Sequence, residues 1–218
     1  MIELHFPVLG TALSADHGYA LYSALSRIVP DLHKPNAGVL VGPIAGEYVG
    51  KRELRLDHRR SRLRLRLLPD HIGFVLPLAG RSLELGHHRV RLGVPQVRTL
   101  IPATVLSARM VTIKRSDRQD ANGTKGYMEP AAFLEAVRQE LTRRGIGGKA
   151  EFPLITVGDR AGQPRRRVLR IKEQKIIGFS VHVTDLNADE SVRLQEAGLG
   201  GRRKMGCGFF VAMKETRP

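Results

Sequence analysis

Near the end of the chain stands the stretch Gly198-Leu199-Gly200-Gly201-Arg202-Arg203-Lys204-Met205-Gly206-Cys207-Gly208, which is followed by the largely apolar residues 209–213. Its eleven positions hold five glycines and three consecutive basic residues. Glycine tolerates positive φ and has no Cβ, so its backbone N–H can come close to an anionic oxygen. We therefore expect this loop to contact a polyanion. The candidate residues are Gly198, Gly200, Gly201, Arg202, Arg203, Lys204, Gly206 and Gly208.

The order of elements around this loop excludes the common nucleotide-binding motifs. Residues 187–197 are predicted to form a short helix, with Asn187 as its N-cap. The chain therefore runs helix, glycine loop, strand, whereas a dinucleotide fingerprint requires strand, glycine turn, helix. No Gly-Lys-Ser/Thr is present for a Walker loop. The alternative is a helix C-cap with a tight turn, and the three adjacent cations favour phosphate contact instead.

The composition indicates the same kind of partner. The 218 residues include 36 Lys and Arg against 21 Asp and Glu, which gives a net charge of +15. Such an excess is typical of proteins that bind nucleic acid, or less often an anionic membrane. No apolar run approaches the roughly 20 residues of a membrane span, and no signal peptide is evident, so a membrane partner is not expected. The single cysteine, Cys207, suits a reducing, cytoplasmic location.

Hydrophobic periodicity predicts a mixed α+β chain. In the first half we expect strands at 2–9, 39–44, 60–67, 82–85 and 89–92, with helices from Ser14 or Asp16 to Ile28 and over 70–78. In the second half we expect strands at 104–114, 152–157, 166–172 and 176–184 and after the glycine loop, with helices over 129–144 and 187–197. This order predicts two ferredoxin-like (βαββαβ) domains in tandem, residues 1–100 and 101–218.

The glycine loop between the last helix and the last strand of a basic chain resembles the RAMP (RRM-like) superfamily of CRISPR systems. Within it, the run Asp16-His17-Gly18-Tyr19-Ala20-Leu21-Tyr22-Ser23-Ala24-Leu25-Ser26, with Pro30 and His33 after it, resembles the myxobacterial-type branch of repeat-processing endoribonucleases. The resemblance implies cleavage of CRISPR repeat RNA (pre-crRNA) into mature crRNA. It also implies a catalytic histidine in or just after the first helix.

The resemblance selects His17 and His33 as candidates for that histidine, with Tyr19 and Tyr22 as supporting residues. The sequence alone leaves open which histidine acts, and a helix-start or core role is the alternative for each. No metal-ligand spacing and no acidic cluster for magnesium are visible, so no metal and no cofactor are expected. We expect the RNA 2′-hydroxyl to act as nucleophile, which yields a 2′,3′-cyclic phosphate and a 5′-hydroxyl.

Two groups of basic residues are expected to bind the RNA rather than to react. The stretch 60–67 alternates arginine with serine or leucine, which predicts a strand with one arginine face. A repeat RNA hairpin would be gripped through its backbone and shape by such a face, while a solvated surface is the alternative. The candidate residues are Arg60, Arg62, Arg64 and Arg66 in this group, and Arg165, Arg166 and Arg167 in the second.

Two other functions share these features. A non-catalytic RAMP-type subunit that holds guide RNA, together with other subunits of a CRISPR effector complex, would have the same fold, charge and glycine loop without a working histidine. An unrelated basic ferredoxin-like RNA-binding protein of ribosome or tRNA metabolism would show no preference for the repeat. Incubation of the protein with labelled repeat RNA separates these alternatives.

Overall fold

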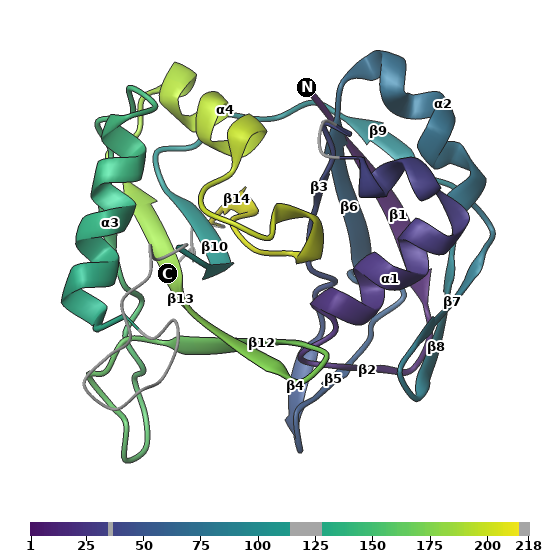
Figure 1. The fold of residues 1–218 in the computed structure, drawn as a ribbon, viewed down its shortest axis with the longest axis horizontal. Helices are drawn as coiled ribbons and strands as arrows, with labels where there is room; N and C mark the ends of the chain where they lie inside the picture. Colours follow the sequence, from purple (N-terminus) through teal and green to yellow (C-terminus); the bar gives the residue numbers. More distant parts are fainter. Residues whose placement is uncertain (35–36, 114–127, 214–218) are drawn as a thin grey trace. The chain divides into compact units, whose positions relative to one another are not determined.

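The structure is a computed structural model that describes residues 1–34, 37–113 and 128–213. It divides into two compact units, one of Met1–Leu100 together with Lys204–Gly206, and one of Ile101–Arg203 together with the residues from Cys207 onward (Figure 1). The short segment Lys204–Gly206 therefore packs with the first unit, whereas the sequence predicts that all of residues 101–218 belong to the second domain.

The first unit is built on an antiparallel sheet in the order β3-β6-β1-β8-β7, with β9 also paired to β1. Its strands are β1 (Ile2–Leu9), β3 (Leu40–Val41), β6 (Arg62–Leu67), β7 (Ser82–Leu85), β8 (His88–Leu92) and β9 (Gln96–Arg98). If the β7–β8 hairpin is set aside as an insertion, β3, β6, β1 and β9 lie in the ferredoxin-like order. The period-two leucines of β6 produce this arrangement, because Leu63, Leu65 and Leu67 all point into the core.

Helical segments cover the buried face of this sheet. They are α1 (Gly18–Ile28), η1 (Pro30–His33), η2 (Pro69–His71), α2 (Ile72–Val75) and η3 (Leu76–Leu78). Leu21, Ala24 and Leu25 of α1 follow helical spacing and join the strand leucines in one hydrophobic core. Proline at position 30 ends α1 and begins η1, since it has no N–H for the helix but fits its first turn.

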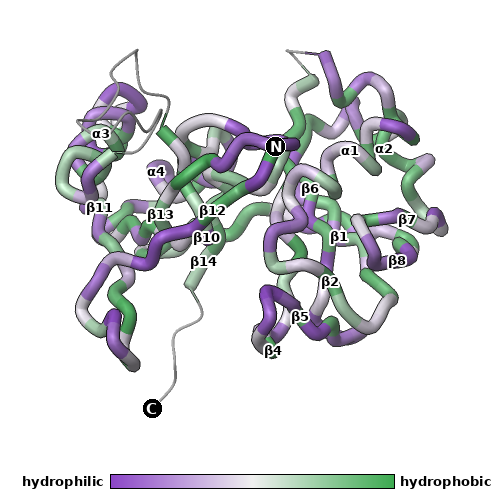
Figure 2. The backbone as a smooth tube through the Cα atoms, turned by 60° about the horizontal axis from the view of Figure 1, so that its bottom comes forward, coloured by the Kyte–Doolittle hydropathy of each residue, from purple (hydrophilic) through white to green (hydrophobic). Residues whose placement is uncertain are grey.

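A second, three-stranded sheet lies in the same unit, in the order β2-β5-β4. Its strands are β2 (Ala12–Ser14), β4 (Glu47–Gly50) and β5 (Glu53–Arg55). The tip of the β4–β5 hairpin is hydrophilic, as the purple tube in Figure 2 shows. This small sheet leads directly into α1 and so positions the start of that helix.

The second unit repeats the same topology. Its sheet has the order β11-β13-β10-β14, with β12 added beside β13. The strands are β10 (Leu106–Val111), β11 (Lys149–Glu151), β12 (Arg166–Ile171), β13 (Gln174–Thr184) and β14 (Phe210–Ala212). The helices α3 (Pro130–Thr142) and α4 (Ala188–Ala197) bury one face of this sheet, and η4 (Arg203–Met205) lies in the glycine loop. The predicted tandem ferredoxin-like fold is therefore observed in both units.

The cap of α4 agrees with the sequence. Asn187 is the N-cap, and its side chain accepts a hydrogen bond from the Glu190 N–H at 2.9 Å. The Glu190 carboxylate in turn accepts from the Asn187 N–H at 3.0 Å, which completes a capping box. Gly198 then ends the helix with φ of +60°, so the helix delivers the chain into the glycine loop.

Two local predictions are wrong. The predicted strand 152–157 contains only an isolated bridge at Leu154, and the paired strand is β11, Lys149–Glu151. Pro153 has no N–H for a ladder, which is why the pairing stops before it. The N-cap of α1 is His17 rather than Ser14 or Asp16, because Ser14 still belongs to β2.

Candidate active site

His33 and Tyr22 form a pair at the end of α1. Leu32 is fully buried and anchors η1, which leaves the neighbouring His33 side chain exposed. Tyr22, on the preceding helix, places its hydroxyl 2.9 Å from the His33 Nδ1. The two rings meet edge to face, with centroids 5.3 Å apart. If Nδ1 carries the proton and donates to the tyrosine oxygen, Nε2 is left as a base that faces solvent.

Lys204, from the glycine loop, holds the backbone on both sides of His33. Its Nζ donates hydrogen bonds to the Leu32 carbonyl at 2.7 Å and to the Lys34 carbonyl at 2.5 Å. Burial lowers the pKa of the Lys204 ammonium. Lys204 was predicted to contact RNA, whereas in the structure its ammonium is occupied with these two carbonyls. Tyr22 thus contacts the ring of His33, and Lys204 binds the carbonyl groups of the two residues that flank it.

His17 has a different environment. It is 1% exposed, and its Nδ1 lies 2.8 Å from the Ser14 carbonyl. Its Nε2 accepts a hydrogen bond from the Ile44 N–H at 3.0 Å. Because Nε2 accepts, Nδ1 carries the proton and donates to Ser14, which describes a neutral imidazole. Both ring nitrogens of His17 therefore contact backbone groups, whereas Nδ1 of the exposed His33 contacts a side chain.

Tyr19 is half-buried, about one turn before Tyr22 on α1. Within the described ranges of the chain, it makes no ring contact with His17 or His33. Of the two tyrosines predicted to support the site, the structure brings Tyr22 to a histidine.

The glycine loop uses several of its glycines for packing within the second unit. A Cβ at Gly200 would lie 2.2 Å from the Thr112 carbonyl oxygen, and one at Gly208 would lie 1.9 Å from that of Leu199. The Gly201 N–H donates to the Thr112 carbonyl at 2.8 Å, and the Gly208 N–H donates to the Met110 carbonyl at 2.7 Å. These N–H groups are therefore satisfied internally, which differs from the expected contact with anionic oxygens.

The other predicted loop residues lie apart from these contacts. Arg203 is exposed and donates from Nη1 to the Ala197 carbonyl at 2.7 Å. Arg202 is half-buried and adopts a φ of +56°, which a residue with a Cβ seldom adopts. Gly206 has a φ of +82° and packs in the first unit against Pro43.

The predicted arginine face of β6 is only partly a surface. Arg66 is 1% exposed, and its Nε donates to the Glu3 carboxylate at 2.6 Å across the β1–β6 pair. Burial alone would raise the pKa of Glu3, but hydrogen bonds and charges from His5, Arg66 and Arg64 outweigh it and lower that pKa to about 2. Arg66 thus departs from the expected RNA-binding face because a strand partner buries its charge.

The remaining three arginines of this group are more accessible. Arg62 and Arg64 are half-buried on β6, and the Nη1 of Arg62 donates to the carbonyls of His58 and Ser61 at 3.0 and 2.8 Å. Arg60 precedes the strand and is exposed, with its Nε 4.0 Å from the Asp57 carboxylate. A phosphate can reach Arg60 without displacing a buried partner.

The second arginine group lies along β12 in the second unit. Arg165 and Arg166 are exposed, whereas Arg167 is half-buried and its Nε donates to the Ser180 hydroxyl at 3.1 Å. Burial, together with the charges of Arg109 and Arg165, lowers the pKa of Arg167 to about 10. These cations are close enough to repel one another, so an anionic ligand would stabilise them.

Two residues beside this group were not predicted. Arg109 on β10 and His182 on β13 are half-buried on the polar positions of their strands. Burial lowers the pKa of His182, and the charge of Arg165 acts in the same direction. Polar and apolar residues alternate strictly along 106–109 and 179–184. This alternation predicts that Arg109 and His182 lie on the polar face of the sheet.

Comparison with known proteins identifies the family. The family described as Cas6 Crispr matches residues 2–215. The chain belongs to the Cas6 family. A relative from Myxococcus xanthus (strain DK1622), named CRISPR-associated endonuclease Cas6, is 35% identical over 210 residues, which cover 96% of this chain and 80% of the relative. The resemblance to myxobacterial-type proteins that the sequence indicated is therefore confirmed.

Solved structures of Cas6 and RAMP proteins share the fold. A structure described as "CRISPR associated protein Cas6" has a TM-score of 0.64 at 16% identity and covers 98% of both chains. One described as "An RAMP protein binding different RNA substrates" has a TM-score of 0.67 at 12% identity, over 98% of this chain and 100% of that one. The tandem ferredoxin-like architecture of the Cas6 family is thus confirmed.

Two further observations concern membrane-spanning helices and metal-binding clusters. Within the described ranges, no helix is long and apolar enough to cross a membrane. In that same part of the chain, no three His, Cys, Asp or Glu residues are grouped in a way that could hold a metal ion.

Proposed function

We propose that this Cas6-family chain is an endoribonuclease that cuts CRISPR repeat RNA, with His33 as its catalytic base. The observation that supports this role best is the pairing of an exposed histidine with Tyr22 at 2.9 Å, on a backbone held by Lys204. An orienting partner on one ring nitrogen is what a general base requires, since it leaves the other nitrogen directed at the substrate. The endonuclease name of the Myxococcus relative agrees with this proposal.

The reaction follows from the chemistry of RNA. Nε2 of His33 removes the proton of the 2′-hydroxyl, and the 2′-oxygen forms a bond to the adjacent phosphorus. The bond between phosphorus and the 5′-oxygen breaks, and that oxygen takes up a proton from solvent. The products are a 2′,3′-cyclic phosphate and a 5′-hydroxyl. No metal is needed to generate the nucleophile, because the substrate supplies it and histidine titrates near neutral pH.

The proposed substrate is a repeat RNA hairpin held by exposed cations. Arg203 in the glycine loop, Arg60 before β6, and Arg165 and Arg166 near the start of β12 are the accessible members of the predicted set. A-form RNA is recognised mainly through its backbone and shape, which suits contacts made by arginine. Each phosphate contact adds about 0.7–0.9 to the slope of log affinity against log salt, so binding should weaken steeply with salt.

The test uses purified protein and labelled repeat RNA, with and without a 2′-deoxy substitution at the cut site. We expect the ribose substrate to give a 2′,3′-cyclic phosphate and the deoxy substrate to be bound but left uncut. Cleavage of the deoxy substrate would contradict the 2′-hydroxyl mechanism. Binding of both RNAs without cleavage of either would identify a non-catalytic guide-RNA-binding subunit instead.

A further inference from the structure

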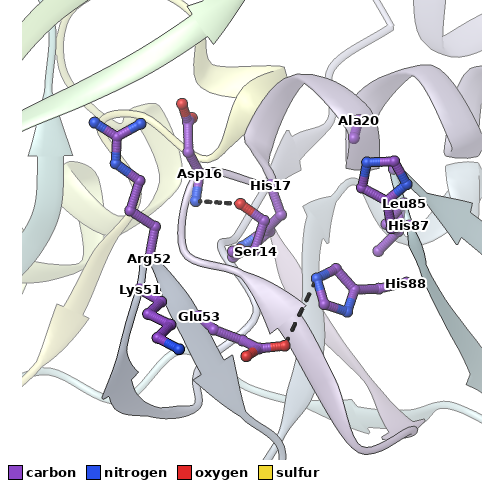
Figure 3. A pocket seen from close by; sticks show the side chains of 11 residues that line it. Ser14, Asp16, His17, Ala20, Lys51, Arg52, Glu53, Leu85, His87 and His88 are labelled. Atoms are coloured by element: carbon purple, nitrogen blue, oxygen red, sulfur yellow. Dashed lines mark hydrogen bonds and ion pairs between the residues drawn. The ribbon is translucent and has the colours of Figure 1, made fainter.

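A separate cavity lies at the opposite end of α1 from His33. It has a volume of about 450 Å³ and opens between the tip of the β4–β5 hairpin, the tip of the β7–β8 hairpin and the residues that lead into α1 (Figure 3). All of these segments belong to the first unit. The volume falls in the range of cavities that bind small molecules.

The hairpin tip at this cavity has an unusual backbone. Gly50 pairs with Glu53, which leaves Lys51 and Arg52 as a two-residue turn. Both have positive φ, 44° and 62°, the combination of signs that a type I′ turn requires. Such turns strongly prefer Asn-Gly, because the Cβ of most residues crowds the backbone at positive φ, which glycine and asparagine tolerate best. The chain therefore holds two cations at a place where Asn-Gly would fold with less strain, which points to a function.

The turn is also fixed in position. The Arg52 carbonyl accepts a hydrogen bond from the Ala15 N–H at 2.7 Å, and Glu53 pairs with Ser14 of β2. The two cations are consequently tied to the segment that begins α1. Among the described residues, neither the Lys51 nor the Arg52 side chain has an ion-pair partner, and both are exposed.

The other residues that line the cavity include both carboxylate and imidazole side chains. Asp16 and Glu53 supply carboxylates, and Glu53 lies 4.0 Å from His88. His87, at the tip of the second hairpin, is exposed beside the same space (Figure 3). The carboxylates would repel a bare inorganic anion, so the ligand must carry hydrogen-bond donors together with its negative charge. A nucleotide has both, since amino groups on its base can donate to carboxylates and its ring can stack on an imidazole.

We propose that this cavity binds one unpaired nucleotide of the RNA, with its two flanking phosphates on Lys51 and Arg52, whose side chains point in opposite directions (Figure 3), and its base toward Glu53 and His87. The inference rests on the proposed function, because the RNA is the substrate of the His33 site. The 11 residues of α1 span about 16 Å at about 1.5 Å per residue. One RNA strand is long enough to contact both this cavity and His33.

The turn itself offers a test that separates binding from folding. The double variant Lys51→Asn/Arg52→Gly installs the preferred turn residues and should raise the Tm while it removes both cations. The double variant Lys51→Gln/Arg52→Gln keeps the side-chain stems and removes only the charge. Lys172→Gly is the matched control, because Lys172 is a basic turn residue with φ of +52° in the other unit and does not line the cavity.

The measurements are Tm, the Kd for labelled repeat RNA with an unpaired flank at several salt concentrations, and single-turnover cleavage. We expect both double variants to bind at least fivefold more weakly and to lose about 1–2 from the salt slope, while Lys172→Gly changes the Kd less than twofold. Unchanged affinity and slope in both double variants, or an equal loss in Lys172→Gly, would overturn the nucleotide site. Cleavage by the wild type is read separately, so failure of the His33 mechanism is distinguishable from failure of this site.

Discussion

The Tyr22 hydroxyl lies 2.9 Å from Nδ1 of His33, so one nitrogen of this exposed imidazole has a side-chain partner. Tyr22→Phe removes the hydroxyl but keeps the edge-to-face ring contact. We expect single-turnover cleavage to slow about tenfold, the equivalent of about 1.4 kcal/mol, while the Kd for RNA stays within twofold. A variant that cleaves at the wild-type rate would show that the hydroxyl does not orient the imidazole.

Lys204 is expected to act as a positioning residue. Lys204→Met keeps the length of the side chain but leaves the carbonyls of Leu32 and Lys34 without their donor, so the backbone around His33 loses its support. We predict a cleavage rate about tenfold or more below wild type, with RNA affinity changed less than threefold.

Arg203→Met is the matched control for this change. Arg203 is the neighbouring loop cation, but it is exposed and its partner is the Ala197 carbonyl. The variant Arg203→Met should lower the affinity for RNA and the salt dependence of that affinity, with little effect on the cleavage rate at saturating RNA. If Lys204→Met behaves in the same way as this control, Lys204 binds RNA and does not position His33.

The Glu3–Arg66 pair should make stability depend on acid pH. The folded pKa of Glu3 is about 2, below its ordinary value of 4.5. The ionised Glu3 carboxylate therefore adds on the order of 3 kcal/mol to the free energy of unfolding. This stabilisation is complete above about pH 4.5 and is lost as the pH falls toward 2. Urea unfolding between pH 7 and pH 3 measures this loss. Glu3→Gln should be less stable at pH 7 and have a flatter pH dependence, and parallel curves would rule out the assignment.

Gly208 should tolerate no side chain. A Cβ there would lie 1.9 Å from the Leu199 carbonyl oxygen, and φ is +64°. Gly208→Ala is expected to lower the free energy of unfolding by about 2 kcal/mol or more. At Gly201 the nearest atom to a Cβ is 3.6 Å away, so Gly201→Ala should change stability by no more than about 0.5 kcal/mol. Equal Tm values for the two variants would contradict this packing role.

Local patterns in the sequence predict the fold, because residues close together in the chain determine where each helix and strand lies and which face it buries. The period-two leucines of β6 define its buried face, and Asn187 with Glu190 defines the start of α4. Pro153, which has no N–H to donate, interrupts the predicted strand 152–157, and the pairing lies at Lys149–Glu151 instead.

The site could be predicted only in part, because its decisive contacts join residues far apart in the chain. His17 and His33 are equivalent in the sequence, and the Ile44 N–H that occupies His17 is 27 positions away. Arg66 has the same alternation as Arg64, yet it is buried by Glu3, 63 positions earlier. Lys204 reaches a carbonyl 172 positions earlier. No local pattern contains such pairings.

The central claim is that His33 removes the proton of the 2′-hydroxyl without a metal. The most direct test is the single-turnover cleavage rate of repeat RNA in EDTA for wild type, His33→Ala and His58→Ala, the last being an exposed histidine of the first unit that makes no contact with Tyr22 or Lys204. We predict full wild-type cleavage in EDTA, a loss of about 10²–10⁴-fold in His33→Ala with RNA affinity retained, and no loss in His58→Ala. Cleavage by His33→Ala at the wild-type rate, or abolition of wild-type cleavage by EDTA, would contradict the claim.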